Sequence, residues 1–364
     1  MSKRTTHYSI LIVCEGENTE PKYFESIYTK IIEEGIWGDK FNVVIIPKPK
    51  VEEVEETKTS KHKSKRKERH ILDDDIPMRP VIEDEYRTQP MSFVREAQVE
   101  MQDGSYDEAW AVFDYDHRKF EFINKAFELA KSEELGVVRI AYSSVAIEHW
   151  FLLHFERNTT DFQKSECRIG RDHLNCNSGE HDQDCYGARC VGGYLRNRKY
   201  LNISTKGSIS LFTFLEPFLN KAYVNASWLR HLIISRNPKA PLFNLNPYTD
   251  VDLLVKYLLK KHTHIVWMDL NKAFSKRHYK MTANIDNSII SLTILNQSKT
   301  AQIINANEIL IVDDLLNELY FLNERYRLEP DQNILIQIDL NTLQNPEFLI
   351  FKFDANEHIY LKLT

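Results

Sequence analysis

The chain has 364 residues, a length that suits one large domain or two of moderate size. Hydrophobic residues make up 42% and charged residues 27%, which is ordinary for a globular protein, and the net charge of −6 excludes a generally basic one. Any contact with nucleic acid must therefore use local basic patches. We expect a cytoplasmic protein with no membrane partner, because the sequence contains neither a long apolar run nor the hydrophobic core of a signal peptide.

Strands and helices alternate in the first part of the chain, as judged from apolar runs and apolar stripes with helical spacing. The predicted strands cover 8–14, 41–46, 109–113 and 137–142, and the predicted helices cover 19–35, 92–101, 120–135 and 146–155. This order predicts an α/β fold in which helices flank a parallel sheet.

Two polar insertions interrupt this pattern. Residues 50–90 form an acidic, then basic, then acidic block, in which seven of the thirteen residues from 58 to 70 are Lys or Arg. We expect either a solvated insertion whose charges neutralise one another or an arm that binds nucleic acid. Residues 158–200 form a second insertion, rich in Cys and His.

The remainder of the chain divides into a helical extension and a β-rich tail. Helices are predicted at 210–223, 226–235 and 250–261, and alternating apolar residues after about 281 predict half-buried strands. We therefore expect one domain over 1–265, which contains both insertions, and a small C-terminal β-rich domain over 281–364.

Acidic residues stand at the carboxyl ends of two predicted strands. Glu15 follows the first strand, and Asp114 and Asp116 end the third. Alternate residues of an extended segment point the same way, so the two aspartates share a face. If the strands are neighbours, three carboxylates converge and need a cation. Oxygen ligands without His or Cys favour Mg²⁺ or Mn²⁺. Alternatively, acids at strand ends simply face water.

Four segments, taken together, resemble the RloB family, whose members look like stand-alone Toprim nucleases of bacterial antiphage and restriction loci. These segments are ILIVCEGENTEPKYF, AWAVFDYD, AYSSVAIEHWFLLHFE and NPYTDVDLLVKYL. The resemblance covers roughly residues 7–48, 91–156 and 210–260. It implies a Toprim-like parallel sheet but does not account for the charged insertion, the whole Cys/His-rich insertion or the β-rich tail.

The Toprim pattern implies roles for individual residues. Glu15 would be a metal ligand or the general acid/base, and Asp114 and Asp116 would bind Mg²⁺. Gly16 would let a phosphate approach the backbone closely. Glu148 matches an acid of the family's Phe-Glu-x-Trp segment, although Ile147 replaces the usual aromatic residue. Alternatively, Glu148 is only an acid at a helix N-terminus that Ser143 or Ser144 caps.

The same resemblance implies an antiphage effector that hydrolyses phosphodiester bonds, with RNA favoured over DNA and tRNA as the first expectation. An ABC-type ATPase in a separate polypeptide would act as its sensor. Apart from the resemblance, the C-terminal β-rich domain could be an oligomerisation or sensor element, so the effector could form a homo-oligomer. A cationic residue is expected near the scissile phosphate; the candidates are Arg118, Arg196, Arg198, Lys199 and Lys206. The alternative is a catalytically silent Toprim-fold subunit that binds a nucleotide or a protein partner.

Four cysteines lie close together in the second insertion, at Cys167, Cys176, Cys185 and Cys190. Cytoplasmic thiols stay reduced, so this grouping favours a structural Zn²⁺ site over disulfides. The segment has few apolar residues, and a metal would help to order it. However, the spacing contains no Cys-x2-Cys pair, and four unligated cysteines in a loop are the alternative. Cys14 lies in an apolar strand and is expected in the core.

Overall fold

The computed structural model describes residues 8–47, 82–102, 104–115, 119–165, 168–169, 172–173, 190–201, 211–261, 263–354 and 357–363. Most of the two insertions predicted at 50–90 and 158–200 lies outside these residues. The chain forms two compact units. The first unit comprises Met1–Asp114, Arg118–Ala141 and Gly207–Ile209, and the second comprises Tyr115–His117, Tyr142–Lys206 and Ser210–Thr364.

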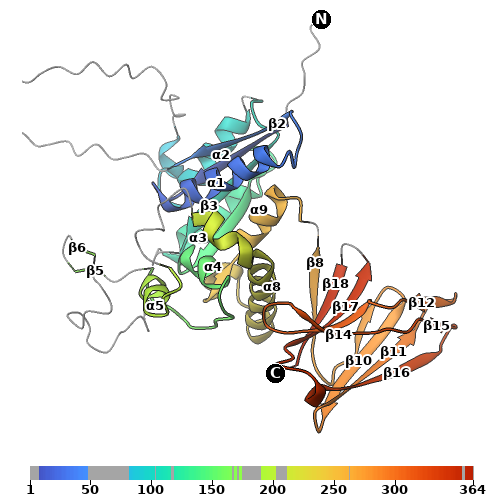
Figure 1. The fold of residues 1–364 in the computed structure, drawn as a ribbon. Helices are drawn as coiled ribbons and strands as arrows, with labels where there is room; N and C mark the ends of the chain where they lie inside the picture. Colours follow the sequence, from blue (N-terminus) through green and yellow to red (C-terminus); the bar gives the residue numbers. More distant parts are fainter. Residues whose placement is uncertain are drawn as a thin grey trace, which may run out of the picture. The chain divides into compact units, whose positions relative to one another are not determined.

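A parallel sheet forms the centre of the first unit. Strand β1 (Tyr8–Cys14) pairs in parallel with β2 (Phe41–Ile46) on one side and with β3 (Glu108–Asp114) on the other. Residues Ile10–Cys14 are buried without alternation, as expected for a central parallel strand covered on both faces. The helices of this unit are α1 (Thr19–Glu33), α2 (Met91–Gln102) and α3 (Phe120–Ala130), together with the short 3-10 helix η1 (Asp84–Tyr86) (Figure 1).

Strand β4 (Arg139–Ser144) passes from the first unit into the second. Its last residues pair antiparallel with β7 (Tyr248–Thr249), and the strand order of the whole sheet is β2-β1-β3-β4-β7. Short elements of the second unit are β5 (Arg168–Ile169), β6 (Asp172–His173), η2 (Glu216–Phe218) and η3 (Leu242–Asn244). Its helices are α4 (Glu148–Leu152), α5 (Val191–Asn197), α7 (Leu211–Leu215), α8 (Leu219–Arg236) and α9 (Val251–Leu258).

The C-terminal part of the second unit consists mainly of strands. They form sheets with the orders β16-β11-β10-β9 and β14-β13-β17-β18-β8, and a two-stranded sheet β12-β15. Strand β8 runs parallel to β18, whereas the other pairs in this region are antiparallel. The strands are β8 (His264–Met268), β9 (Phe274–Lys276), β10 (Tyr279–Asp286), β11 (Ile289–Asn296), β12 (Gln302–Ile304), β13 (Ile309–Val312), β14 (Glu318–Phe321), β15 (Tyr326–Leu328), β16 (Asn333–Asp339), β17 (Phe348–Asp354) and β18 (Glu357–Lys362), with η4 (Leu340–Thr342) between β16 and β17.

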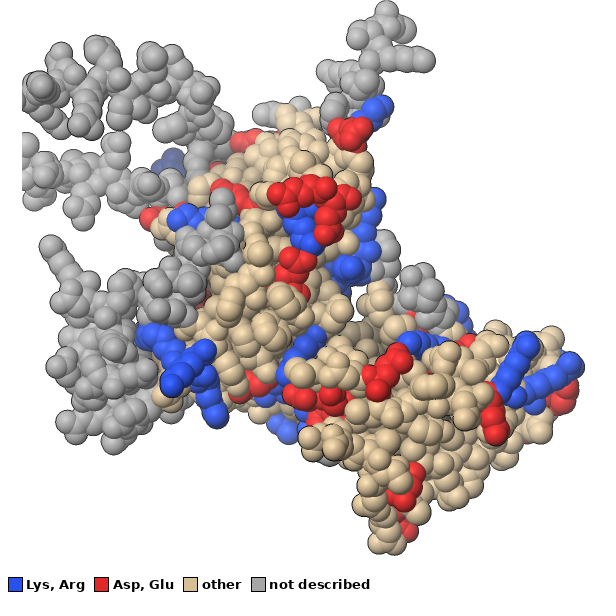
Figure 2. Space-filling model, viewed as in Figure 1, with Lys and Arg blue, Asp and Glu red and all other residues tan. Residues whose placement is uncertain are grey.

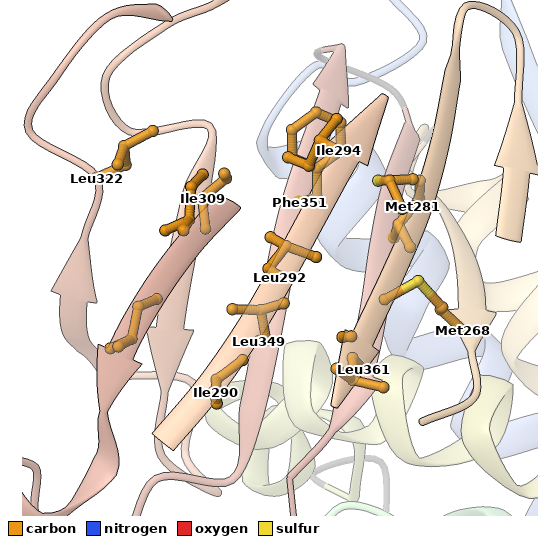
Figure 3. Close-up of a cluster of buried hydrophobic side chains, with 14 of the residues drawn as sticks. Met268, Met281, Ile290, Leu292, Ile294, Ile309, Leu322, Leu349, Phe351 and Leu361 are labelled. Carbon is orange, nitrogen blue, oxygen red and sulfur yellow. The ribbon is translucent and has the colours of Figure 1, made fainter. Parts of the chain in front are cut away.

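Side chains from both larger C-terminal sheets share one hydrophobic core (Figure 3). Ile290, Leu292 and Ile294 alternate along β11 and are all buried, while Leu349 and Phe351 contribute from β17. This period of two is what a strand with one buried face requires. The alternating apolar residues therefore identify the buried face of these strands.

The structure confirms a mostly parallel N-terminal sheet with helices and a β-rich C-terminal region. The bounds of several elements differ from the prediction. The strands of the tail begin at β8, earlier than predicted, and α8 is continuous where a break was predicted between 223 and 226. Asn225 does not interrupt α8 because its side-chain amide is buried and donates a hydrogen bond of 2.7 Å to the carbonyl of Leu153. None of the described helices is long and apolar enough to cross a bilayer.

Candidate functional site

The carboxyl ends of β1 and β3 bring Glu15 and Asp114 together. Glu15 directly follows β1, and its backbone N–H donates to the carbonyl of Val112 at 2.9 Å. Asp114 is the last residue of β3, and its backbone N–H donates to Oε2 of Glu15 at 2.9 Å. The Glu15 side chain is buried, with 9% of its surface exposed, whereas Asp114 is partly exposed. One oxygen of Glu15 is thus fixed by the neighbouring strand.

The third predicted carboxylate, Asp116, lies outside the described residues, as does the candidate cation Arg118. Among the residues that the structure describes, no three His, Cys, Asp or Glu side chains are grouped so that they could hold a metal ion. The three-carboxylate site therefore stays a prediction, of which the structure describes Glu15 and Asp114.

Gly16 lies directly against the side chain of a neighbouring acid. A Cβ atom added to Gly16 would lie 1.7 Å from Oε2 of Glu20, which belongs to the first turn of α1. The Glu20 side chain is 8% exposed, so the turn after β1 packs closely against this carboxylate. The sequence prediction considered Gly16 only for the approach of a phosphate. In the structure, the carboxylate of Glu20 occupies the space where a side chain at position 16 would begin.

Cys14, which precedes these acids, belongs to the core. It has no exposed surface, and burial raises the pKa of its thiol well above the usual value, with the carboxylates of Glu20 and Glu25 adding to the shift. A thiol in this environment is a poor nucleophile because it stays protonated.

In the second unit, Glu148 is the first residue of α4 and is 6% exposed. The hydroxyl of Ser165 donates to its Oε2 at 3.0 Å. The prediction that Ser143 or Ser144 caps this helix is wrong, because no side chain caps α4 and the hydroxyl of Ser143 instead pairs with that of Thr249 at 3.1 Å. Ser165 is the partner that sequence reasoning missed.

Basic side chains gather at α5 on the face shown in Figure 2. Arg196, Arg198 and Lys199 come from the end of this helix, and Arg198 and Lys199 are exposed. The guanidinium group of Arg198 lies over the ring of Tyr194, 5.3 Å from its centre. Lys206, another candidate, lies outside the described residues.

Glu156 anchors the tyrosines around α5. It accepts hydrogen bonds from the hydroxyls of Tyr194 at 2.8 Å and Tyr200 at 2.9 Å, and from the side-chain amide of Asn158 at 2.8 Å. Burial opposes ionisation of Glu156, but these hydrogen bonds outweigh it and lower its pKa. The two tyrosine hydroxyls therefore position α5 against the segment that follows α4.

The four-cysteine zinc site stays a prediction. Cys190, which directly precedes α5, is fully buried. Cys167, Cys176 and Cys185 lie outside the described residues.

Sequence reasoning also missed a buried charged network at the start of α9. Both terminal nitrogens of Arg230 donate to the carboxylate of Asp252, which has no exposed surface. Asp250 accepts a hydrogen bond of 2.8 Å from the hydroxyl of Tyr248, and burial raises the pKa of Asp250 to about 6. The usable signal was an Asp at 252 followed by a Lys four residues later on an otherwise apolar helix.

A comparison with protein-family models shows which family the chain belongs to. The model of the RloB family, described as RloB-like protein, matches residues 10–258, well over half of the chain. The chain belongs to this family. The match begins within β1, includes β3, α4 and α9 of this RloB-like chain, and ends before the C-terminal strands.

Comparisons beyond the family add little. No curated protein matches this RloB-like chain. Among solved structures, the yjhA protein from Bacillus subtilis shares 11% identity over 26% of this chain and 98% of its own, with a TM-score of 0.22. A Bacillus halodurans protein described as a candidate alpha-N-acetylgalactosaminidase shares 12% identity over 68% of this chain and 61% of its own, with a TM-score of 0.13. At these TM-scores, neither structure indicates the fold or the function of this chain.

Proposed function

We propose that this RloB-like chain is a metal-dependent endonuclease of the Toprim type that acts as an antiphage effector. The observation that carries the proposal is the pairing of Glu15 with Asp114 at the carboxyl ends of two adjacent parallel strands. Ligands of open parallel sheets bind at this edge. Membership of the RloB-like family and the Glu-Gly and Asp-x-Asp patterns support the same assignment.

The donor set fits Mg²⁺ or Mn²⁺. Glu15 and Asp114 offer carboxylate oxygens, and Asp116 would add another. Hard divalent cations prefer such ligands. A bound divalent cation would supply Lewis-acid stabilisation of the charge on the transferring phosphate.

The protein's own side chains have distinct roles in this proposal. The Asp114 N–H holds Oε2 of Glu15, so Glu15 is already oriented before substrate binds. Glu148, held by Ser165, is the candidate general acid/base. Arg198 and Lys199 would contact phosphates of the substrate, whereas Nε and Nη1 of Arg196 are buried. Glu156 keeps their helix in place through Tyr194.

For the substrate we favour RNA over DNA, with tRNA first. Two exposed basic residues at the end of α5, with a tyrosine ring beneath Arg198, suit a strand whose phosphates and bases are both contacted. We further propose that a separate ABC-type ATPase restrains or triggers the nuclease, and that the effector can form a homo-oligomer. If the ATPase only restrains the nuclease, the purified chain is active by itself; if the ATPase triggers the nuclease, it must be added to the cleavage test below.

The test is cleavage by the purified chain. Labelled tRNA, other RNA and DNA are incubated with Mg²⁺ or with EDTA, and the product ends are sequenced. We expect Mg²⁺-dependent cleavage, and a loss of about 100-fold or more in Asp114→Asn/Asp116→Asn and in Glu15→Gln, because these changes remove metal-binding charge.

Glu134→Gln is the matched control, because Glu134 is an exposed acid outside the candidate site. It should cleave like the parent chain. Circular dichroism must show that every variant is folded. If folded Asp114→Asn/Asp116→Asn retains full metal-dependent cleavage, the nuclease proposal is wrong. If the parent chain cleaves nothing yet binds RNA or a protein partner, the catalytically silent subunit is favoured.

A further inference from the structure

A cavity of about 510 Å³ lies in the second unit beside α8, α9 and β8. Helix α8 contributes Ser227, Arg230 and His231, which share one face because they are three and four residues apart. A neighbouring cavity of about 360 Å³ shares Lys256, Lys261, Thr263 and Ile265 with it. Both volumes fall within the range typical of small-molecule sites.

The polar lining of the larger cavity, among the described residues, consists of cationic side chains, imidazoles and hydroxyls and contains no acidic side chain. Its basic members are Arg230, His231, Lys256, Lys261 and His264. Acids outside the lining pair with four of these groups: Asp252 with Arg230 and Lys256, Asp269 with His231 at 3.3 Å and Glu357 with His264 at 3.5 Å. Lys261, which is exposed, is therefore the lining cation most available to a ligand. A lining of this kind is complementary to a ligand that carries several acceptor oxygens and negative charge.

The acids that orient these cations lie behind them. Asp252 has no exposed surface, binds both terminal nitrogens of Arg230 and lies 3.7 Å from Nζ of Lys256. Arg230 also donates to the carbonyl of Thr249 at 2.7 Å. The side chains of Arg230 and Lys256 are 14% and 13% exposed, so both are held nearly rigid at the cavity wall. Such preorganised cations lose little entropy when an anion binds.

The remaining wall is apolar. Leu253, Ile265, Val266 and Trp267 line the same cavity as the basic residues. The indole N–H of Trp267 is already used, since it donates to the hydroxyl of Ser227 at 3.1 Å. The cavity therefore offers a surface for an uncharged ring system next to the cationic wall.

We propose that this cavity binds a nucleotide, with its phosphates on Lys256 and Lys261 and its nucleoside part against the apolar wall. The family resemblance and the carboxylate site do not assign this cavity a role. The proposal does not depend on nuclease activity. A nucleotide bound here would link α9 to β8, and thus the family-matched part of the chain to the C-terminal strands.

Isothermal titration calorimetry in EDTA tests the proposal, because chelation removes metal-dependent binding at the carboxylates. The probes are ATP, AMP, inorganic phosphate and adenosine. We expect binding of ATP and AMP but not of adenosine, and about tenfold weaker binding by Lys261→Gln, which removes one charge-assisted contact. His264→Gln should weaken binding to a smaller extent.

Lys239→Gln is the matched control, because Lys239 is an exposed lysine outside the cavity lining. It should bind nucleotide as the parent chain does. The proposal is overturned if the parent chain binds no nucleotide at millimolar concentration, if folded Lys261→Gln binds as tightly as the parent, or if adenosine binds as well as AMP. Binding of an RNA oligonucleotide that depends on Lys261, without binding of mononucleotides, would assign the cavity to nucleic acid instead.

Discussion

At the scale of single residues, one hydrogen bond of 2.9 Å, from the Asp114 N–H to Oε2 of Glu15, joins the two described acids of the candidate site. Apolar runs that end in Glu15 and Asp114 predict their approach, because the carboxyl ends of parallel neighbours share one edge. The hydrogen bond from the Asp114 N–H depends on strand register, which no residue pattern specifies. The position of the Glu20 carboxylate against Gly16 depends on side-chain orientation and could not be predicted either.

Gly16→Ala should reveal the contact with Glu20. The new methyl group would lie 1.7 Å from Oε2 of Glu20, so this buried carboxylate must move. Because the clash is with the end of a flexible side chain, we expect a loss of only about 1–2 kcal/mol in the free energy of unfolding. Urea denaturation of Gly16→Ala, Glu20→Ala and the double variant measures the coupling between the two positions.

In the Glu20→Ala background, the added methyl group has room, and the cost of Gly16→Ala should largely disappear. An equal cost in both backgrounds would mean that the backbone of the turn, rather than Glu20, requires glycine.

At the scale of elements, periodicity located the N-terminal strands well and the segments around them less well. Strand β2 was predicted with its observed bounds, because a short, mostly apolar run is bounded by Lys40 and Pro47. Helix α4 is shorter than predicted, since the apolar residues beyond Leu152 continue in hydrogen-bonded turns rather than in a regular helix. Apolar character indicates burial there, but it does not specify helical hydrogen bonds.

The segment after α4 should make stability depend on pH. His154 is fully buried, and burial lowers its pKa to about 3. The unfolded chain takes up a proton near pH 6.5 that the folded chain refuses, so stability is lost as the pH falls below that value. At pH 5 the loss from this one group is about 2 kcal/mol relative to neutral pH.

Urea denaturation at pH 7.5 and pH 5 checks this expectation. His154→Leu should lose about 2 kcal/mol less than the parent chain between the two pH values, whatever its absolute stability. Asp250, whose raised pKa acts in the opposite direction, is present in both chains and cancels in the comparison. An identical loss in both proteins would show that His154 is protonated in the folded state.

At the scale of the whole molecule, the C-terminal strands are integrated with the helices of the second unit. Val224 of α8 is buried in a cluster with Trp267, Phe348 and Tyr360. The guanidinium of Arg157 lies 4.7 Å from the ring centre of Phe348 and 5.6 Å from that of Trp228, and it forms an ion pair with Glu347. The β-rich tail can be predicted from its alternating apolar residues, but contacts between distant segments leave no periodic pattern in the sequence.

These contacts predict that the chain shortened to residues 1–261 is unstable. Removal of the strands exposes Val224 and Trp228 on α8 and leaves Arg157 without Glu347. Exposed apolar patches promote association, so we expect a lower melting temperature and aggregation on gel filtration. Val224→Ser/Trp228→Gln in the shortened chain should restore a monomer, because it removes the exposed apolar side chains. If the shortened chain without these substitutions is monomeric and has the melting temperature of the full chain, α8 does not need the strands.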